Sequence, residues 1–202
     1  MKIVLPLLFA ASALLSKGVW SAELQSLVIH RESDRYILDV TALVAVPVDV
    51  ARRVVSDYDN LTSINPFLKK SKVLKQHDEN RKTVHLVTGI CVWHICYHVT
   101  HVQAFKWERN GDLFAEIVPE LSDFSSGWMR WKLHAHGNCT RIMLHSEFVP
   151  DFIVPPLVGP YLIKKKLAEI ATETMEGVEN RVAAGIDPSA TGPECSPPAA
   201  GH

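Results

Sequence analysis

The chain has 202 residues, of which 47% are hydrophobic, and its 21 basic and 22 acidic side chains give a formal net charge of -1 at pH 7. Proteins that bind nucleic acid commonly carry a basic stripe with interleaved aromatic residues. No such stripe is present in the sequence, so no nucleic-acid partner is predicted.

Residues 1–21 have the layout of a secretory signal peptide. Lys2 supplies a positive charge, and residues 3–15 form an almost unbroken apolar run. This run is shorter than the roughly 20 residues that span a bilayer, so cleavage, between Ser21 and Ala22, is favoured over anchoring. We therefore expect a periplasmic or secreted protein.

The other end of the chain, residues 185–202, is rich in proline and small residues, which cannot supply a hydrophobic core. We expect this tail to be disordered. Residues 22–184 then remain as one domain, which is long enough to bury a core of its own.

All four cysteines follow the expected signal peptide, and an oxidising compartment allows a disulfide. Cys91 and Cys96 are the best pair if they flank a tight turn, because facing positions of a hairpin bring Cα atoms within the roughly 4.4–6.8 Å that the bond requires. The alternative, two small buried thiols, stays open.

In chain order, the domain begins with a predicted strand at residues 36–46, which are rich in β-branched residues and partly alternate. Pro47 ends this strand and favours the first turn of a helix, and apolar residues recur at helical spacing over residues 47–57. A second short helix is expected to begin at Asn60 and to end early because of Pro66.

From residue 70 to residue 150 strand-like segments alternate with polar turns, and no helical period is present. With the first strand, the predicted sheet has seven strands. The six strands of this part are 72–77, 83–92, 96–105, 113–118, 127–136 and 140–150.

The last structured segment, residues 155–182, has a helical period. At 28 residues it is much longer than the 11 or 12 residues of an average globular helix. A helix of this length needs a large apolar partner, and the apolar face of a single sheet is the partner that we expect.

Three stretches resemble the START-like superfamily, also called SRPBCC or polyketide cyclase/dehydrase. Residues 46–61 (VPVDVARRVVSDYDNL) are similar to its first helix, which ends in an aspartate–tyrosine pair and a leucine. Residues 67–74 (FLKKSKVL) resemble the approach to its second strand, and residues 127–133 (GWMRWKL) resemble its Gly-x-x-x-Trp-x-Leu strand. The resemblance covers about residues 38–183, and the subgroup named after coenzyme Q-binding START-like domains is the most similar one.

This resemblance implies an α+β helix-grip fold, in which a seven-stranded curved antiparallel sheet wraps around a long C-terminal helix and two short helices follow the first strand. It also implies a cavity between sheet and helix for a lipid, a quinone or a polyketide. Affinity would come mainly from buried apolar area, at roughly 25 cal/mol per Å². No residue-level ligand signature transfers with the resemblance.

Alternation along the predicted strands and the helix selects candidate cavity residues. On one strand, Met129, Trp131 and Leu133 share the more apolar face, whereas Trp128 and Arg130 lie on the other. The full candidate set is Leu86, Ile90, Met129, Trp131, Leu133, Tyr161, Leu167, Ile170 and Met175.

No catalytic residue, metal site or cofactor is predicted. His134 and His136 form a His-x-His on a strand, but a third ligand and an acidic partner are missing from the pattern. Hydrolase motifs are absent as well. A cyclase or dehydratase needs a general acid and a general base, and the side chains available for these roles are Glu116, Glu147, Asp123, His85 and His134. Each of them is expected to be solvated or to lie at the edge of the core.

Two basic clusters, residues 69–72 and 164–166, have two interpretations: they bind anionic lipid head groups, or they are ordinary solvent-exposed surface. Residues 152–160 are apolar and stiffened by proline, and they fit either a pocket rim that touches a membrane or a connector packed under the sheet. A transient membrane contact therefore stays open beside the apolar ligand.

The sequence thus predicts the binding or carriage of a hydrophobic small molecule, rather than catalysis. One alternative is an enzyme of cyclase or dehydratase type that uses the same cavity. The other is a protein-interaction module whose cavity is filled by its own side chains and which exposes a large apolar patch.

Overall fold

A computed structural model of the protein describes residues 22–92, 95–154 and 159–186. Eight strands form a single antiparallel sheet in this part of the chain, in the order β1-β2-β8-β7-β6-β5-β4-β3. The strands are β1 (Glu23–Glu32), β2 (Arg35–Val44), β3 (Leu68–Gln76), β4 (Arg81–Val92), β5 (Ile95–Trp107), β6 (Leu113–Ile117), β7 (Phe124–His136) and β8 (Cys139–Pro150).

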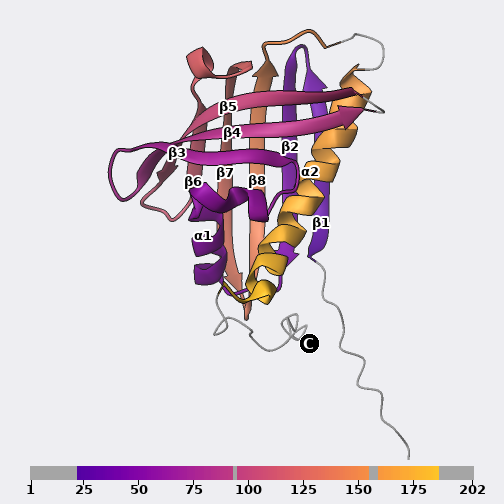
Figure 1. The fold of residues 1–202 in the computed structure, drawn as a ribbon. Helices are drawn as coiled ribbons and strands as arrows, with labels where there is room; N and C mark the ends of the chain where they lie inside the picture. The colour runs from indigo at the N-terminus through magenta and orange to yellow at the C-terminus, as the bar shows by residue number, and fades with distance from the viewer. Residues whose placement is uncertain (1–21, 93–94, 155–158, 187–202) are drawn as a thin grey trace, which may run out of the picture.

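The helices are few, and one of them is long. They are α1 (Val48–Ser56), the 3-10 helices η1 (Tyr58–Ser63) and η2 (Pro119–Leu121), α2 (Gly159–Arg181) and the π-helical segment η3 (Val182–Ile186). Figure 1 shows β3, β4 and β5 crossing β7 and β8, so the sheet is strongly curved, and α2 runs along the β1 and β2 side. The α+β class, the antiparallel sheet and the long C-terminal helix are confirmed.

The prediction of seven strands is wrong, because β1 was missed. Its apolar residues Leu24, Leu27 and Ile29 do not alternate strictly, since the register with β2 shifts between Leu24 and Ser26. A bulge of this kind inserts an extra residue and breaks the period of two on which strand prediction rests.

Several boundaries also differ from the prediction. The second short helix is the 3-10 helix η1, and α2 is described from Gly159, because residues 155–158 of the predicted helix lie outside the described residues. The expected signal peptide, residues 1–21, and residues 187–202 of the expected tail lie outside the described residues. Among the helices of the described part, none is long and apolar enough to cross a membrane.

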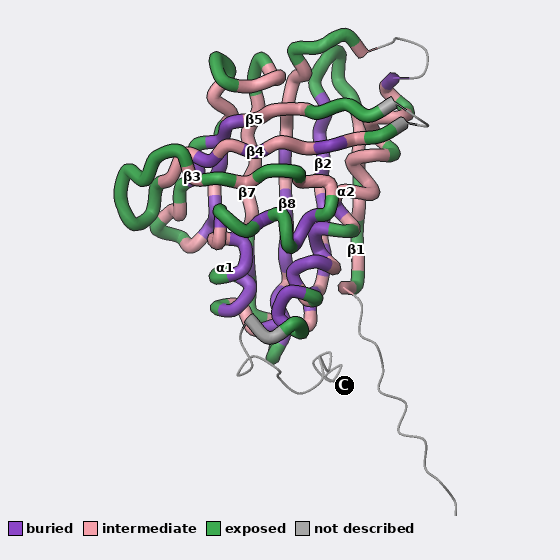
Figure 2. The backbone as a smooth tube through the Cα atoms, in the orientation of Figure 1, coloured by how far each residue is buried: buried purple, intermediate pink, exposed green. Residues whose placement is uncertain are grey.

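The core lies between the concave face of the sheet and the helices. Alternate residues of β2 and β8 face each other across the ladder, with Val40 opposite Leu144 and Ala42 opposite Ile142. These four residues belong to one buried cluster with residues of α1 and α2. Figure 2 shows that buried residues gather toward α1 and the last turns of α2, while the opposite end of the molecule is mostly half-buried or exposed apart from the start of β2, where Tyr36 and Ile37 are buried.

Polar contacts fix the last two turns of α2. The amide of Asn65 donates a hydrogen bond to the hydroxyl of Thr174 at 2.9 Å, and the Ala45 backbone N–H donates to Glu179 Oε1 at 2.5 Å. Arg181, which is buried, forms an ion pair with Asp57. This end of the helix is therefore tied to both the sheet and the segment around η1.

Gly177 brings the backbone of α2 against the end of η1. A Cβ atom at this position would lie 1.9 Å from the carbonyl oxygen of Ile64. Because that neighbour is backbone, no rotation of a side chain can make room for a methyl group. Gly177 therefore sets the distance between α2 and η1.

We predict that Gly177→Ala lowers the free energy of unfolding by about 1–3 kcal/mol, the usual cost of overpacking. Helix propensity alone would stabilise the variant by up to about 1 kcal/mol. Urea denaturation measures the change, and Glu173→Ala at an exposed position of the same helix is the control. A Gly177→Ala variant as stable as the wild type would contradict the prediction.

Candidate functional site

The concave face of the sheet is deeply buried beside the second half of α2, which we call the closed end, and less buried beside the first half, which we call the open end. By helical spacing, Leu167 lies on the same stripe of α2 as Met175 and Val178. Met175 and Val178 are 1% and 0% exposed, whereas Leu167 is only half-buried. The same gradient runs along β7, where Leu133 is buried and Trp131 is half-buried. Burial of the inward-facing side chains therefore decreases toward the first half of α2, while Met129 and Trp131 still pack against the core cluster.

The candidate cavity residues divide between the closed and the open end. Leu86, Leu133 and Met175 belong to the buried core cluster. Five others are half-buried at the open end, and they are Ile90, Met129, Trp131, Leu167 and Ile170.

Tyr161 departs from this set, because it is 70% exposed. By helical spacing it lies about 120° from Leu167 but about 40° from Met175, so its position on the helix does not exclude it from the inward side. Its inclusion among the cavity residues stays a prediction.

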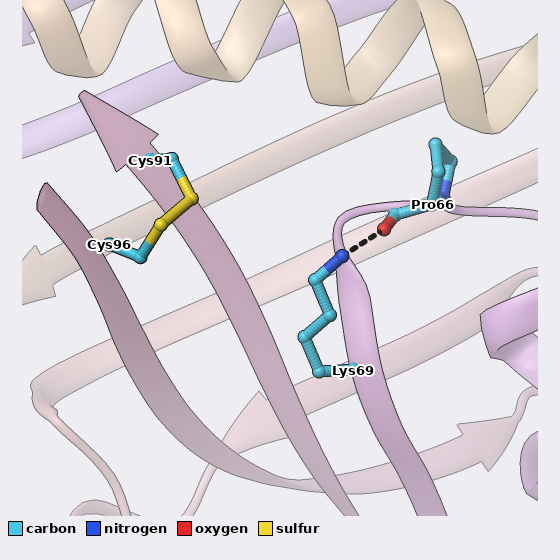
Figure 3. Close-up of a disulfide and its surroundings, with 4 residues drawn as sticks. All are labelled: Pro66, Lys69, Cys91 and Cys96. Carbon is cyan, nitrogen blue, oxygen red and sulfur yellow. Dashed lines mark hydrogen bonds between the residues drawn. A yellow bond between two sulfur atoms is a disulfide. The ribbon is translucent and has the colours of Figure 1, made fainter. Parts of the chain in front are cut away.

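A disulfide joins the ends of β4 and β5 (Figure 3). Cys91 and Cys96 face each other in register with Cα atoms 4.0 Å apart, and both are exposed. This is the pair that the sequence favoured. By loop-closure entropy such a bond stabilises the hairpin by about 2 kcal/mol. Beside it, Lys69 Nζ donates a hydrogen bond to the Pro66 carbonyl at 2.8 Å. No cysteine of the described part is free.

Thr88, His101 and Gln103 form a hydrogen-bonded cluster on the concave face of the same hairpin. His101 pairs with Leu86 across the ladder, and Gln103 pairs with Val84. Leu86 and Val84 belong to the core cluster, so their partners face inward too. His101 Nε2 lies 3.1 Å from Thr88 Oγ1, and His101 Nδ1 lies 3.0 Å from Gln103 Nε2.

These contacts define the tautomer of His101. An amide nitrogen can only donate, so Gln103 Nε2–H donates to Nδ1. The ring proton then lies on Nε2, which donates to the Thr88 hydroxyl. Burial and, to a smaller extent, the neighbouring His85 lower the pKa of His101 to about 4, and Asp123 opposes this shift. The ring is therefore uncharged near neutral pH.

One acceptor in this cluster has no partner. Gln103 is 3% exposed, and its Oε1 is buried without a hydrogen bond to any described residue. The Tyr36 hydroxyl is buried and unpaired in the same way among the described residues, and burial raises the pKa of Tyr36. Unpaired buried polar atoms are uncommon, because each forfeits the hydrogen bonds that it makes to water.

A row of aromatic rings connects these two unpaired groups. Phe124 lies edge-on to His101 with ring centroids 6.0 Å apart and edge-on to Phe148 at 5.4 Å. Phe148 stacks on Tyr36 at 5.7 Å. The row runs from β5 to β2 and forms an apolar wall beside the polar cluster.

Most of the acid–base candidates lie on the other face of the sheet. Glu116 and Glu147 both pair with Trp128, which points away from Met129. His85 and His134 alternate with core residues and share that outer face. Asp123 Oδ2 accepts the Thr100 backbone N–H at 2.6 Å. These groups do not converge with His101 into an acid–base pair.

The outer face carries its own charged network around His145. Its Nδ1 lies 2.7 Å from Asp39 and its Nε2 lies 3.2 Å from Glu147, and Arg35 also pairs with Glu147 at 2.8 Å. The two carboxylates raise the pKa of His145 against the effect of burial. Across the described residues, no group of three or more His, Cys, Asp or Glu side chains could hold a metal ion.

The residues predicted from the sequence do not include the Thr88–His101–Gln103 cluster. The signal was present, because alternation along the predicted strand 96–105 places His101 and Gln103 on the same face as Phe105. Candidate residues were chosen for apolar character, which excluded polar residues on an inward face.

A family profile described as polyketide cyclase/dehydrase and lipid transport matches residues 36–183. A search of curated proteins finds no match. Similar solved structures include the Zhui aromatase/cyclase from Streptomyces sp. R1128 (13% identity, TM-score 0.64, 77% of this chain and 98% of that chain). A second is a START superfamily protein from Mycobacterium smegmatis (18% identity, TM-score 0.57, 73% of this chain and 97% of that chain). A third is a STAR-related lipid transfer protein from Xanthomonas axonopodis (12% identity, TM-score 0.56, 78% of this chain and 98% of that chain).

We predict that His101 titrates near pH 4, which ring ¹⁵N–¹H correlation spectra across pH 3–8 measure. Its folded-state pKa lies below the unfolded value of 6.5, so as the pH falls the unfolded chain binds a proton at a higher pH than the folded chain does. Stability therefore falls as the pH falls from about 6.5 to about 4. His145, whose pKa is raised, is the internal reference. Titration of His101 at or above 6.5 would contradict the burial described here.

Proposed function

Because the chain belongs to the polyketide cyclase/dehydrase and lipid-transport family, within the START-like superfamily, we propose that it binds and carries a hydrophobic small molecule between the sheet and α2. The observation that carries the proposal is the gradient of burial along the concave face. Apolar side chains such as Met129, Trp131 and Leu167 point inward yet remain half-buried. A ligand that covers them gains roughly 25 cal/mol for each Å² of apolar area removed from water.

The anchoring of α2 supports reversible binding. The hydrogen bonds, the ion pair and the close backbone approach that tie the helix to its neighbours in the described structure involve Thr174, Gly177, Glu179 and Arg181, all in its second half, whereas the first half has Lys166 over the Phe67 ring at 5.8 Å. The first half lies over the open end of the sheet and can move outward without breaking these contacts. Such a movement would admit and release a ligand.

The positions of the acid–base groups favour binding over catalysis. A cyclase or dehydratase needs an acid and a base on the substrate. Here Glu116, Glu147, His85 and His134 lie on the face opposite His101. The half-buried inward residues likewise favour a binder over an interaction module whose interior is filled.

The proposed carrier acts outside the cytoplasm and touches membranes transiently. The signal-peptide layout of residues 1–21 supports export, and the Cys91–Cys96 disulfide suits an oxidising compartment. Ile153 and Phe152 are 93% and 42% exposed. The ring of Phe152 lies edge-on to Phe124, next to the open end. Exposed apolar side chains beside the open end suit transfer of a ligand to or from a lipid surface.

We predict that Leu167→Arg abolishes binding of the uncharged fluorescent probe N-phenyl-1-naphthylamine, because it places an unpaired charge over the apolar face. Fluorescence titration of the folded variant measures the loss, and thermal unfolding checks its fold. Glu173→Arg adds the same side chain at an exposed position of the same helix and should bind like the wild type. Equal affinity in Leu167→Arg and the wild type would refute the proposed site.

A further inference from the structure

Cys139, the first residue of β8, is disulfide-bonded and almost completely buried. It follows the turn after β7, and its side chain is part of a residue that is 1% exposed. Its sulfur is bonded to another cysteine, in keeping with the absence of free cysteines from the described part of the chain. The identity of the partner decides which segment of the chain is held at this point.

The partner follows by elimination, because the chain contains four cysteines. Cys91 and Cys96 are bonded to each other and can form no second disulfide. Cys195, which lies outside the described residues, is the cysteine that remains. We propose that Cys139 and Cys195 form a disulfide that anchors the C-terminal segment to the start of β8.

Contacts among the described residues place Cys139 near the end of α2. Glu179, two residues before the end of this helix, accepts the Ala45 backbone N–H at 2.5 Å. The carbonyl of the next residue, Val46, accepts a hydrogen bond from the Thr140 hydroxyl at 2.7 Å. Thr140 follows Cys139 in β8, and Figure 1 shows the end of α2 and the start of β8 at the same end of the molecule.

The segment between the last described residue of this part and Cys195 is long enough to close the bond. Nine residue steps separate Ile186 from Cys195, and each spans at most roughly 3.3–3.6 Å, so together they reach up to about 30 Å. Because α2 ends beside the residues that contact β8, the bond needs only part of this reach.

The bond forms by oxidation of two thiols. Each thiol gives up its hydrogen, and the two electrons and two protons pass to a protein disulfide oxidant of the exporting compartment, whose own disulfide is reduced to two thiols. The signal-peptide layout of residues 1–21 supports such a compartment, and the Cys91–Cys96 disulfide suits it as well.

The role of the bond rests on the proposed function, whereas the bond itself does not. In the proposed carrier the second half of α2 stays in place while the first half moves. The disulfide closes a ring that contains β8 and the whole of α2, so it adds a covalent link to the hydrogen bonds and the ion pair of the fixed half. It therefore confines the opening movement to the first half of the helix.

Non-reducing tryptic peptide mapping of the full chain tests the pairing, because trypsin separates the four cysteines into three peptides. Cys91 and Cys96 stay together in residues 83–106, whereas Cys139 lies in residues 133–141 and Cys195 in the peptide that begins at residue 182. We expect the last two peptides as one linked species, which a reductant converts into its two parts.

Three results would overturn the pairing. The first is recovery of Cys139 or Cys195 as an alkylated thiol after denaturation in the presence of iodoacetamide. The second is a link from either of them to residues 83–106. The third is a linked species found only in covalent dimers, because the bond would then join two chains.

Cys195→Ala tests the role, because it removes the bond and leaves the packing of Cys139 in place. We expect the thermal midpoint to fall by about 5–15 °C, since the bond closes the long loop of residues 139–195. Deuterium exchange of residues 174–181 should become about tenfold faster, and exchange of residues 159–169 should stay within about twofold of the wild type.

The matched control is Cys91→Ala with Cys96→Ala, which removes the exposed disulfide of the β4–β5 hairpin. This bond closes a loop of only a few residues, so its loss should lower the midpoint by about half as much. Deuterium exchange of the second half of α2 should not change in the control.

The outcomes separate this inference from the proposed function. An unchanged midpoint and unchanged exchange in Cys195→Ala, or equal acceleration in both halves of α2, would overturn the anchoring role. Free thiols at Cys139 and Cys195 would overturn the pairing and leave the carrier proposal intact. Failure of the wild type to bind N-phenyl-1-naphthylamine would overturn the carrier proposal and leave the pairing intact. If Cys195→Ala fails to fold, the peptide map of the wild type still decides the pairing.

Discussion

Gly177 allows the backbone of α2 to pass against the carbonyl of Ile64, and this contact determines where the helix lies over the sheet. Around it, Thr174 and Glu179 are held by hydrogen bonds and Arg181 by its ion pair with Asp57. Where the helix is fixed in this way its inward residues Met175 and Val178 are buried, whereas Leu167 in the first half is only half-buried. The burial of the concave face thus follows the packing of α2.

The open end joins an apolar surface to a small uncharged polar cluster. Its hydrogen bonds fix the tautomer of His101, and burial keeps the ring neutral. The buried Gln103 Oε1 has no hydrogen-bond partner among the described residues, which lowers the stability of the fold. In the proposed carrier, buried apolar area supplies the affinity for the ligand.

Much of the fold could be predicted from the sequence, because most strands alternate regularly and the last segment has a long helical period. Met129, Trp131 and Leu133 share the inward face as alternation predicts. β1 was not predicted, because the bulge after Leu24 breaks the alternation of apolar and polar residues along the strand. Hydrogen bonds such as that between His101 and Thr88 join neighbouring strands, and single-strand patterns do not reveal the register that brings them together.

The most direct test of the central claim is native mass spectrometry, combined with organic extraction, of the protein purified from its own cells without detergent. We expect one apolar small molecule per chain, present in the extract in equal molar amount. A mass equal to the polypeptide alone, with no such molecule in the extract and none acquired on incubation with a total lipid extract, would contradict it.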